Sequence, residues 1–538
     1  MQYLHLLCYQ EPPSQNKQLC LVFHEMQQQP PSSHQHHHQE QPQFLGHTGG
    51  IGTGAGAGTG FGFGVGGAGS EGSSGGAGTH HNDGGLRELL VECAASVTSS
   101  DWHRAIRCLV HLSRAASPHG DAVERLAFYF SAALARCLCS LSTPCASEIR
   151  SLLRLNNLHF LLEEDQPPPS FEDDLFYYSG GAEEAYLALN QVTPFIRFSH
   201  LSANQAILEA VDNERAVHIV DLGIMQGLQW PPLMQALVER RRLKQLEEEG
   251  QQQQQQQPPP SSPSSLEHEE QSSEVGRQAH GEEPPTLSSS SSSSSTTLTL
   301  RITGTGPSIS LLEQTGARLR DFARTLHLDF EFDAVCTTSR HVVASLQQHL
   351  ELRRGEALVV NCMTQLHKLL PAAHRAALPH ALEFMRSLCP RILTVAEKES
   401  EHDLSQSFLE RFLVTLDHYV AVFDSLEATL PPRSPQRLMI ERLVLAKEIS
   451  GIVLEDGGGD DENLAVVRHQ SFGNWRRDME AAGFQLVPPS DFAIAQAKLL
   501  LRLHYPADGY RLLVENQHGS LFLSWHDKPL VALSTWSC

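Results

Sequence analysis

The residues whose types and spacing best suit chemistry lie in one short turn, at residues 221–227. A run of β-favouring residues, Val217 to Val220, leads directly into the acid Asp221 and the glycines Gly223 and Gly227. A strand, a glycine-containing turn and a helix begin the folds that bind dinucleotides and adenosyl groups, and the backbone approaches the ligand at the glycines. The segment therefore raises the question of whether a cofactor binds at this turn.

Two features of the sequence argue against a working adenosyl site. A methyltransferase-like turn has the pattern D/E-x-G-x-G-x-G, and here Met225 replaces the middle glycine, so that its side chain would fill space that a nucleoside needs. The next expected strand ends in Thr303, without the carboxylate that binds ribose hydroxyls. We therefore predict no cofactor and a degenerate turn made of Asp221, Gly223, Met225 and Gly227.

Two acidic residues further along the chain, Glu397 and Glu399, are also candidates for chemistry. They follow an expected strand, where paired carboxylates could act as a general acid and base. The alternative is two exposed acids at the start of a helix, where the helix dipole favours negative charge. His218, inside the first strand, is interpreted as a core histidine with satisfied hydrogen bonds. The sequence contains no GxSxG, GxxxxGK[ST] or HExxH motif, so we predict that the protein is not an enzyme.

Metal binding is not predicted from the sequence either. None of the 11 cysteines stands in a CxxC pair or in zinc-site spacing, and they are interpreted as free structural thiols in a reducing compartment. A histidine cluster at His34 and His36–His38 could bind a metal ion, but such tracts are more often solvated disorder.

Charge and hydropathy exclude several classes of protein. The 538 residues carry a formal net charge of −22, which argues against a protein that binds nucleic acid mainly through its phosphates. The first residues, MQYLHLLCYQEPP, lack the positive and apolar regions of a signal peptide. The chain has no apolar run of roughly 18 residues or more, so no segment is expected to span a membrane.

Composition and periodicity predict the elements that position these residues. Residues 1–84 form a Gln-, His- and Gly-rich leader and residues 244–297 a Gln-, Ser- and Pro-rich insertion. Both are predicted to be disordered, because they cannot bury enough apolar surface to offset chain entropy. Apolar residues at helical spacing predict a mainly helical cap over 85–215. Beyond it, short apolar strands alternate with amphipathic helices, which predicts a parallel sheet covered on both faces.

The predicted fold class is α/β: a Rossmann-like, methyltransferase-like, mostly parallel sheet with a C-terminal antiparallel hairpin, plus an all-helical cap. The hairpin is predicted from two apolar runs, 511–516 and 520–525, joined by Gln-His-Gly. Residues 531–536 are expected to add an edge strand. The parallel strands are expected at 217–220, 298–303, 330–335, 357–363 and 391–397.

Several segments resemble the motifs of one plant protein family, the GRAS proteins. VHIVD resembles the family's VHIID motif, formed here by Val217, His218, Ile219, Val220 and Asp221. FGNWRRDMEAAGF and LSWHDKPLVALSTW resemble the SAW region, with tryptophans at Trp475, Trp525 and Trp536. LRITGTG (300–306) and FLERFLVTLDHYVAVFDSLEATLPP (408–432) match two further motifs. AVVRHQ (465–470) departs from the charged RVERHE-like stretch of the family.

The resemblance implies a GRAS domain over residues 85–538, interrupted by the insertion at 244–297. Its parts are the cap with leucine-rich region I (85–215), the VHIID region (216–243), the second strand and leucine-rich region II onward (298–390), the PFYRE-like region (391–470) and the SAW-like region (471–538).

The resemblance also implies a function. GRAS proteins are nuclear transcriptional regulators that bind other transcription factors or other GRAS proteins, including as homo- or heterodimers, with indirect or weak contact to DNA and none to membranes. Residues 226–237 and 492–510 resemble the Lateral suppressor/Monoculm, scarecrow-like branch, which is tied to axillary meristem formation and shoot branching. The alternatives are a direct sequence-specific DNA-binding factor and an S-adenosylmethionine-dependent methyltransferase.

Leucine patterns supply the candidate partner-binding residues. Leu312, Leu319 and Leu326 recur every seven residues. This spacing suits a helix–helix seam, although a helix that faces a sheet has the same spacing. LxxLL motifs can dock as one-sided helical anchors, and they occur at 86–90, 158–162 and 366–370. The three tryptophans of the SAW region either anchor a partner or pack the hairpin. The basic run 240–244 is either an import signal or the cationic end of a helix. The candidate contacts are Leu86, Leu89, Leu90, Leu158, Leu161, Leu162, Leu312, Leu319 and Leu326.

Overall fold

The computed structural model describes residues 83–140, 146–155, 182–255, 298–371, 375–402, 407–454, 466–505, 508–515 and 519–538. The predictions made for residues 1–82 and 256–297 lie outside these ranges. So does the LxxLL motif that contains Leu158, Leu161 and Leu162.

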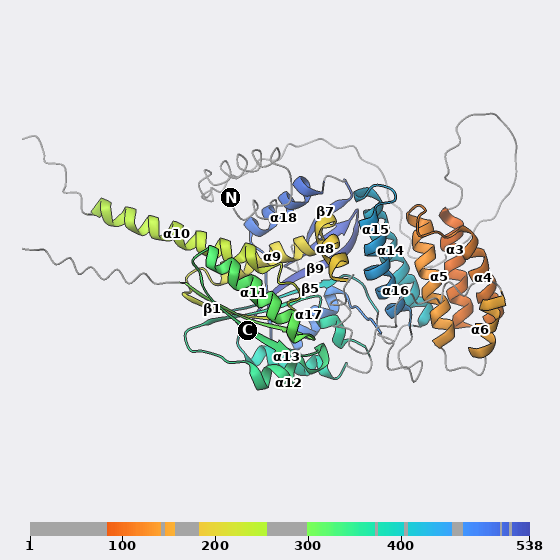
Figure 1. Cartoon of the computed structure of the whole chain (residues 1–538), viewed down its shortest axis with the longest axis horizontal. Coiled ribbons are helices and arrows are strands. Elements are labelled where there is room, and N and C mark those ends of the chain that lie inside the picture. The colour runs from red at the N-terminus through yellow and green to blue at the C-terminus, as the bar shows by residue number, and fades with distance from the viewer. Residues whose placement is uncertain are drawn as a thin grey trace, which may run out of the picture. The chain divides into compact units, whose positions relative to one another are not determined.

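A nine-stranded mixed sheet runs through the described part of the chain (Figure 1). Its strands are β1 (Ala216–Leu222), β2 (Thr299–Gly306), β3 (Asp329–Cys336), β4 (Ala357–Met363), β5 (Ile392–Lys398), β6 (Gln485–Val487), β7 (Tyr510–Glu515), β8 (Ser520–Trp525) and β9 (Lys528–Ser537). The order is β3-β2-β1-β4-β5-β9-β8-β7, and β6 also pairs with β9. Strands β1 to β5 are parallel to one another, and β6 to β9 form only antiparallel pairs, including the pair of β9 with β5. This arrangement confirms the predicted Rossmann-like, methyltransferase-like class.

Strands β1, β4 and β5 form where the sequence has near-continuous apolar runs. A strand covered on both faces needs apolar residues at successive positions, and in β1 every residue after Ala216 is buried. Because successive side chains point to opposite faces, Val217 and Ile219 enter one hydrophobic core and Val220 and Leu222 enter the other.

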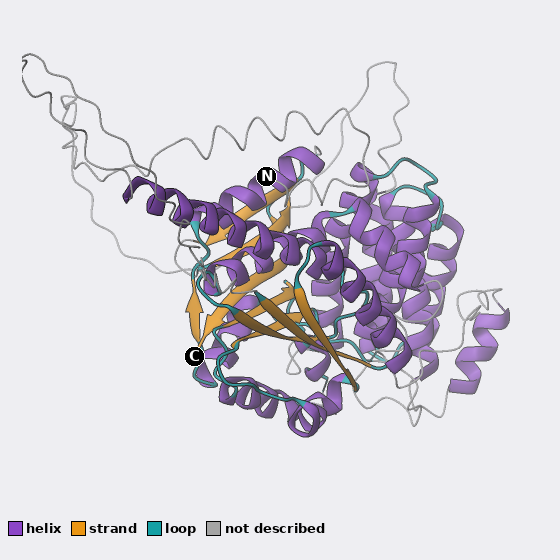
Figure 2. Ribbon diagram, turned by 60° about the vertical axis from the view of Figure 1, so that its left-hand side comes forward, coloured by secondary structure: helices purple, strands orange, loops and turns teal. Residues whose placement is uncertain are grey.

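Helices cover both faces of the sheet, as Figure 2 shows. One core contains residues of α9 (Pro194–Ala210), α10 (Trp230–Gln255) and α11 (Ile309–Thr325). The other contains residues of α12 (Val342–His349), α13 (Ala377–Ser387), α17 (Phe472–Ala481) and the 3₁₀ turn η3 (Leu366–Leu369). A second 3₁₀ turn, η2 (Ser339–His341), precedes α12, and α18 (Asp491–His504) packs on α9 and β7.

Helix α10 continues to Gln255 and so includes the first twelve residues of the insertion predicted to start at residue 244. The segment KQLEEEGQQQQQ consists almost entirely of Lys, Gln, Leu and Glu, which have high helix propensity. Local propensity extends the helix here although most of these side chains are exposed. The compositional rule for disorder therefore placed this boundary too early.

The helical cap is built from two distant parts of the chain. Helix α5 packs against α14 and α16, which follow the sheet strand β5. Phe130 of α5 meets Phe412 of α14 edge to face, with ring centroids 5.5 Å apart. Because α5 is buried on nearly all sides, the helices of residues 85–215 alone do not complete the predicted cap. Its elements are α3 (Asp83–Thr98), α4 (Trp102–Ala115), α5 (Ala122–Ser140), α6 (Ala146–Leu155), α8 (Ala182–Val192), α14 (Phe408–Thr429), α15 (Pro435–Ile440), the π-helical turn η4 (Glu441–Leu445) and α16 (Ala446–Val453).

The predicted edge position of residues 531–536 is wrong. They belong to β9, which lies between β5 and β8 inside the sheet. The predicted hairpin is confirmed as β7 and β8, and β7, not β9, lies at the edge of the sheet. All residues from Leu530 to Trp536 are buried, which is the pattern of an interior strand. Among the described residues, no helix combines the length and the apolar character needed to cross a lipid bilayer.

Candidate functional site

The turn after β1 lies at the carboxyl edge of the parallel strands, where open α/β sheets bind ligands. Gly223, Met225 and Gly227 all have left-handed backbone angles, with φ of 78°, 48° and 67°. The Gly223 N–H donates to Thr305 Oγ1 over 2.9 Å, and the Met225 carbonyl accepts from Thr315 Oγ1 over 2.9 Å. The structure therefore brings the predicted turn residues together and fixes their backbone to β2 and α11.

Protein side chains occupy the space that the two glycines leave open. A Cβ on Gly223 would lie 2.3 Å from the side chain of Gln365, and one on Gly227 would lie 2.9 Å from Thr315 Cγ2. Contacts this short do not occur between real atoms, so larger residues would displace Gln365 and α11. The glycines here make room for the protein's own packing, not for a ligand.

The acid of the turn is also engaged within the protein. The Asp221 carboxylate is 4% exposed. One of its oxygens accepts from Trp230 Nε1 over 2.9 Å and the other from Asn361 Nδ2 over 2.8 Å. Asn361 is held in turn by Gln229 and Thr394. Burial raises the pKa of Asp221 to about 7 although both hydrogen bonds lower it. Asp221 is therefore part of a buried hydrogen-bonded network and does not face an open site.

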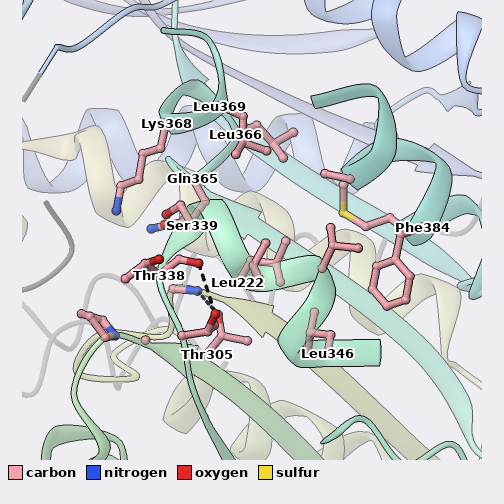
Figure 3. Close-up of a pocket in the computed structure, with 18 of the residues that line it drawn as sticks. Leu222, Thr305, Thr338, Ser339, Leu346, Gln365, Leu366, Lys368, Leu369 and Phe384 are labelled. Carbon is pink, nitrogen blue, oxygen red and sulfur yellow. Dashed lines mark hydrogen bonds between the residues drawn. The ribbon is translucent and has the colours of Figure 1, made fainter. Parts of the chain in front are cut away.

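A small cavity remains beside the turn, between the ends of β1, β2 and β4 (Figure 3). Polar side chains line one side of it, including Thr305, Ser339 and Lys368, and leucines and Phe384 line the other. Its volume is about 40 Å³. That is room for about three water molecules and far below the roughly 300 Å³ at which small-molecule sites begin.

An adenosyl cofactor does not fit these residues. The glycine cradle is filled by Gln365, both oxygens of the Asp221 carboxylate have donors, and β2 carries Thr303 and Thr305 where a ribose-binding acid is needed. We expect isothermal titration calorimetry of the full chain with S-adenosylmethionine to show no binding in the micromolar range. Micromolar binding that Asp221→Ala abolishes would contradict this reading.

His218, the second residue of the VHIID-like motif, lies fully buried in the sheet. Its Nε2 hydrogen-bonds Thr303 Oγ1 over 2.8 Å, and its Nδ1 lies 3.0 Å from Arg301 Nη2. Burial and the neighbouring Arg301 lower the pKa of His218 to about 4. Arg301 is itself ion-paired with Glu356. The geometry agrees with the interpretation of a hydrogen-bonded core histidine.

Of the six predicted partner-binding leucines that the structure describes, four are buried and two, Leu89 and Leu326, are half-buried. Leu312 and Leu319 face the sheet in the core beside α10, and Leu326 packs against the same core. Leu86 and Leu90 are 3% and 0% exposed within the cap. The prediction that these leucines contact a partner directly is therefore wrong. Heptad and LxxLL spacing also arises on helix faces that pack inside the protein. Leu89 is half-buried, and the leucines of the third motif, at 366–370, are buried as well.

The three tryptophans of the SAW-like region pack inside the protein. Trp475 and Trp536 belong to the core that contains α17. Trp525 is 5% exposed, and its ring meets that of Tyr510 with centroids 4.8 Å apart. They hold the antiparallel strands against the rest of the sheet and offer no surface to a partner.

Glu397 and Glu399 form neither an acid–base pair nor the start of a helix. Glu397 is buried at the end of β5 and accepts the backbone N–H groups of η3. Glu399 instead accepts the backbone N–H of Phe472 over 2.8 Å. The two carboxylates bind different backbone segments and do not face a common site. The predicted helix start is wrong as well, because the next helix among the described residues begins at Phe408. The sequence analysis missed that His367 and His469 gather beside Glu397, since residues so far apart in the chain carry no spacing signal.

Comparisons with known proteins cover most of the chain. The profile of the GRAS domain family matches residues 86–247 and 285–537. The chain is 36% identical over 462 residues to Scarecrow-like protein 18 of Arabidopsis thaliana, covering 84% of this chain and 91% of that protein. It is 34% identical over 473 residues to Protein MONOCULM 1 of Oryza sativa subsp. japonica, covering 84% and 88%. The crystal structure of SCL7 in Oryza sativa matches with 29% identity and a TM-score of 0.59, over 84% of this chain and 99% of that one.

Proposed function

The chain belongs to the GRAS domain family, and from this premise we propose that it is a non-enzymatic nuclear regulator of transcription that acts by binding other proteins. The family and the scarecrow-like and monoculm relatives support a role in transcriptional regulation. The resemblance to the Lateral suppressor/Monoculm branch supports a process in axillary meristem formation and shoot branching. The partners are other transcription factors or GRAS proteins.

The closed turn after β1 carries the non-enzymatic part of this proposal. A methyltransferase must admit both its cofactor and its substrate at the carboxyl edge of the sheet. Here Gln365 fills the cradle at Gly223, Asp221 is buried in a network, and the cavity beside them is about 40 Å³. The fold serves as a rigid scaffold whose outer helices are available for recognition.

The second half of α10 is the surface at which we propose that partner proteins bind. Leu243 and Leu246, one helical turn apart, are 49% and 55% exposed, and this end of α10 extends away from the other labelled helices (Figure 1). Exposed leucines beside each other on a helix can serve as anchors for a partner's apolar groove. Leu243 also lies within the basic run 240–244, in which Arg240 and Lys244 pair with Asp212. We propose that this basic run also serves nuclear import.

The proposal is tested by co-purification from plant nuclei. Replacing Leu243 and Leu246 with glutamate should weaken capture of at least one partner by about tenfold or more, because each anchor of a helical contact contributes on the order of 1 kcal/mol or more. The matched control is Leu352→Glu, since Leu352 is 55% exposed but lies in a loop. An unchanged set of partners for the double variant would show that this helix is not the interface.

A further inference from the structure

Three side chains with metal-binding atoms converge at the carboxyl edge of the sheet, outside the turn described above. They are His367 of η3, Glu397 at the end of β5, and His469 in the segment before α17. One potential ligand atom from each lies within 4.8 Å of the other two. The His367 and His469 rings are 4.8 Å apart and inclined at 37°. These residues come from segments separated by at least thirty positions, so only the fold brings them together.

The Nδ1 atom of His469 has a lone pair available for a metal ion. Its Nε2 lies 3.2 Å from Glu448 Oε1, an acceptor-only partner that fixes the proton on Nε2. Its Nδ1 is buried and has no hydrogen-bond partner. Metal-binding histidines characteristically donate their second ring N–H to a carboxylate, as His469 does to Glu448.

Glu397 and His367 are held in place by the backbone and by each other. Glu397 Oε1 accepts the Leu366 N–H over 2.8 Å, and Glu397 Oε2 lies 3.0 Å from His367 Nδ1. Glu397 is 2% exposed and the His367 side chain 14%. A metal ion can take the place of the proton shared between them, and the partial exposure of His367 provides a path of entry.

The charges around the cluster favour a cation. Two carboxylates, Glu397 and Glu448, face these histidines, and the ammonium of Lys398 is paired with Glu448. His402 also lies against His469, with its Nδ1 accepting the His469 backbone N–H over 3.1 Å. The Arg468 guanidinium is directed to the carbonyls of Gly451, Ile452 and Leu454. With neutral imidazoles, the two carboxylates and one ammonium leave a net negative charge.

We propose that His367, Glu397 and His469 bind a divalent first-row transition metal ion, with Zn²⁺ as the preferred ion. Two imidazoles and one carboxylate are a ligand set that suits zinc, with a fourth position left for water. Bond lengths of about 2.0–2.1 Å in a tetrahedral site require ligand atoms about 3.3 Å apart. His367 Nδ1 and Glu397 Oε2 are already 3.0 Å apart, so binding requires mainly that the His469 side chain approach them, by at most about 1.5 Å. The ion then joins the ends of β4 and β5 to the segment that leads into α17.

The test is equilibrium dialysis of the full chain against Zn²⁺ with measurement of bound metal. His34, His36, His37 and His38, which lie outside the described residues, are first replaced by alanine, so that their imidazoles cannot contribute to the measured Zn²⁺. We expect about one Zn²⁺ per chain with micromolar or tighter affinity, and a thermal midpoint that rises with Zn²⁺ concentration. The second readout is the visible absorption of Co²⁺ bound in the same place.

His367→Gln and Glu397→Gln should each lower the affinity at least tenfold, and Glu448→Gln should lower it about 10–100-fold by removing the partner of His469. His367 is partly exposed, so its variant should fold, as circular dichroism would verify. The matched control is His380→Gln, because His380 forms an exposed pair with Glu383 over 3.9 Å. Absence of bound Zn²⁺ overturns the proposal. So does binding that persists unchanged in both the His367 and Glu397 variants, since cysteines elsewhere would then hold the ion. Neither result affects the proposed regulatory function.

Discussion

Replacing Glu441 with alanine should lower the free energy of unfolding by about 3–5 kcal/mol, because it leaves buried guanidinium groups without their carboxylate. Glu441 and Arg125 are both 0% exposed, and Arg125 Nε donates to Glu441 Oε1 over 2.9 Å. Arg437, 3% exposed, lies 3.7 Å from the same oxygen. Without Glu441, the two guanidiniums would share only Glu427, whose side chain is 37% exposed. Urea unfolding followed by far-ultraviolet circular dichroism would measure the loss.

Two controls separate burial from simple charge removal. Glu92→Ala removes a carboxylate from the pair with Arg104, in which both side chains are about half exposed, and should cost less than about 1 kcal/mol. The double variant Arg125→Met, Glu441→Leu should recover most of the stability lost in Glu441→Ala, because apolar residues of similar volume can replace a buried ion pair. If Glu441→Ala lowers the free energy of unfolding no more than Glu92→Ala does, the buried ion pair does not stabilise the contact between the two parts of the cap.

That ion pair also shows where sequence reasoning stops. Arg125 and Glu441 are 316 positions apart, and nothing in the local pattern of either helix indicates the other. The same holds for His367, Glu397 and His469, which meet only because β4, β5 and the segment before α17 end at one edge of the sheet. Clusters of this kind depend on the pairing of distant elements, which periodicity does not report.

The sequence predicted the parallel strands well because their signal is local. Residues 357–363 coincide with β4, and the strands expected at 330–335 and 391–397 differ from β3 and β5 by one residue at each end. A continuous apolar run places β4, and apolar residues that alternate with polar ones place β3. The interior position of β9 had a comparable signal in the run from Leu530 to Leu533, but the edge prediction did not take it into account.

The candidate site was predicted in part. The sequence identified Asp221, Gly223, Met225 and Gly227 as a turn that departs from the adenosyl pattern, and the structure brings them together in a filled cradle. It did not identify Gln365, which fills that cradle, because this residue follows a different strand. The leucine patterns were misleading for a physical reason. A helix that binds a partner and a helix that packs on its own sheet have the same spacing of apolar residues. Only the burial of those residues in the structure distinguishes the two cases.

Asp221→Asn should gain stability relative to the wild-type protein as the pH rises from about 4 to about 7. Burial raises the pKa of Asp221 in the folded protein from 3.8 to about 7, so the folded state holds a proton that the unfolded state has lost. The stability that this proton contributes is complete below pH 3.8 and is lost as the pH rises through 7. Asparagine resembles the protonated acid and does not titrate. About three pKa units at 1.36 kcal/mol each give a change of about 4 kcal/mol between the two proteins.

Urea unfolding of both proteins at intervals between pH 4 and pH 8 would measure this change, with fluorescence of Trp230, whose Nε1 donates to Asp221, as a local probe. The titratable groups facing Asp221 are Tyr186 and Cys362, and the pKa of each is raised above its ordinary value, so neither ionises in this range. Asp212→Asn is the control of opposite sign. The hydrogen bond from Lys244 lowers the pKa of Asp212, so its stabilising effect is present above pH 3.8 and is lost as the pH falls. A difference between wild type and Asp221→Asn that stays constant with pH would mean that Asp221 remains ionised in its network, and the turn after β1 would then hold a buried negative charge.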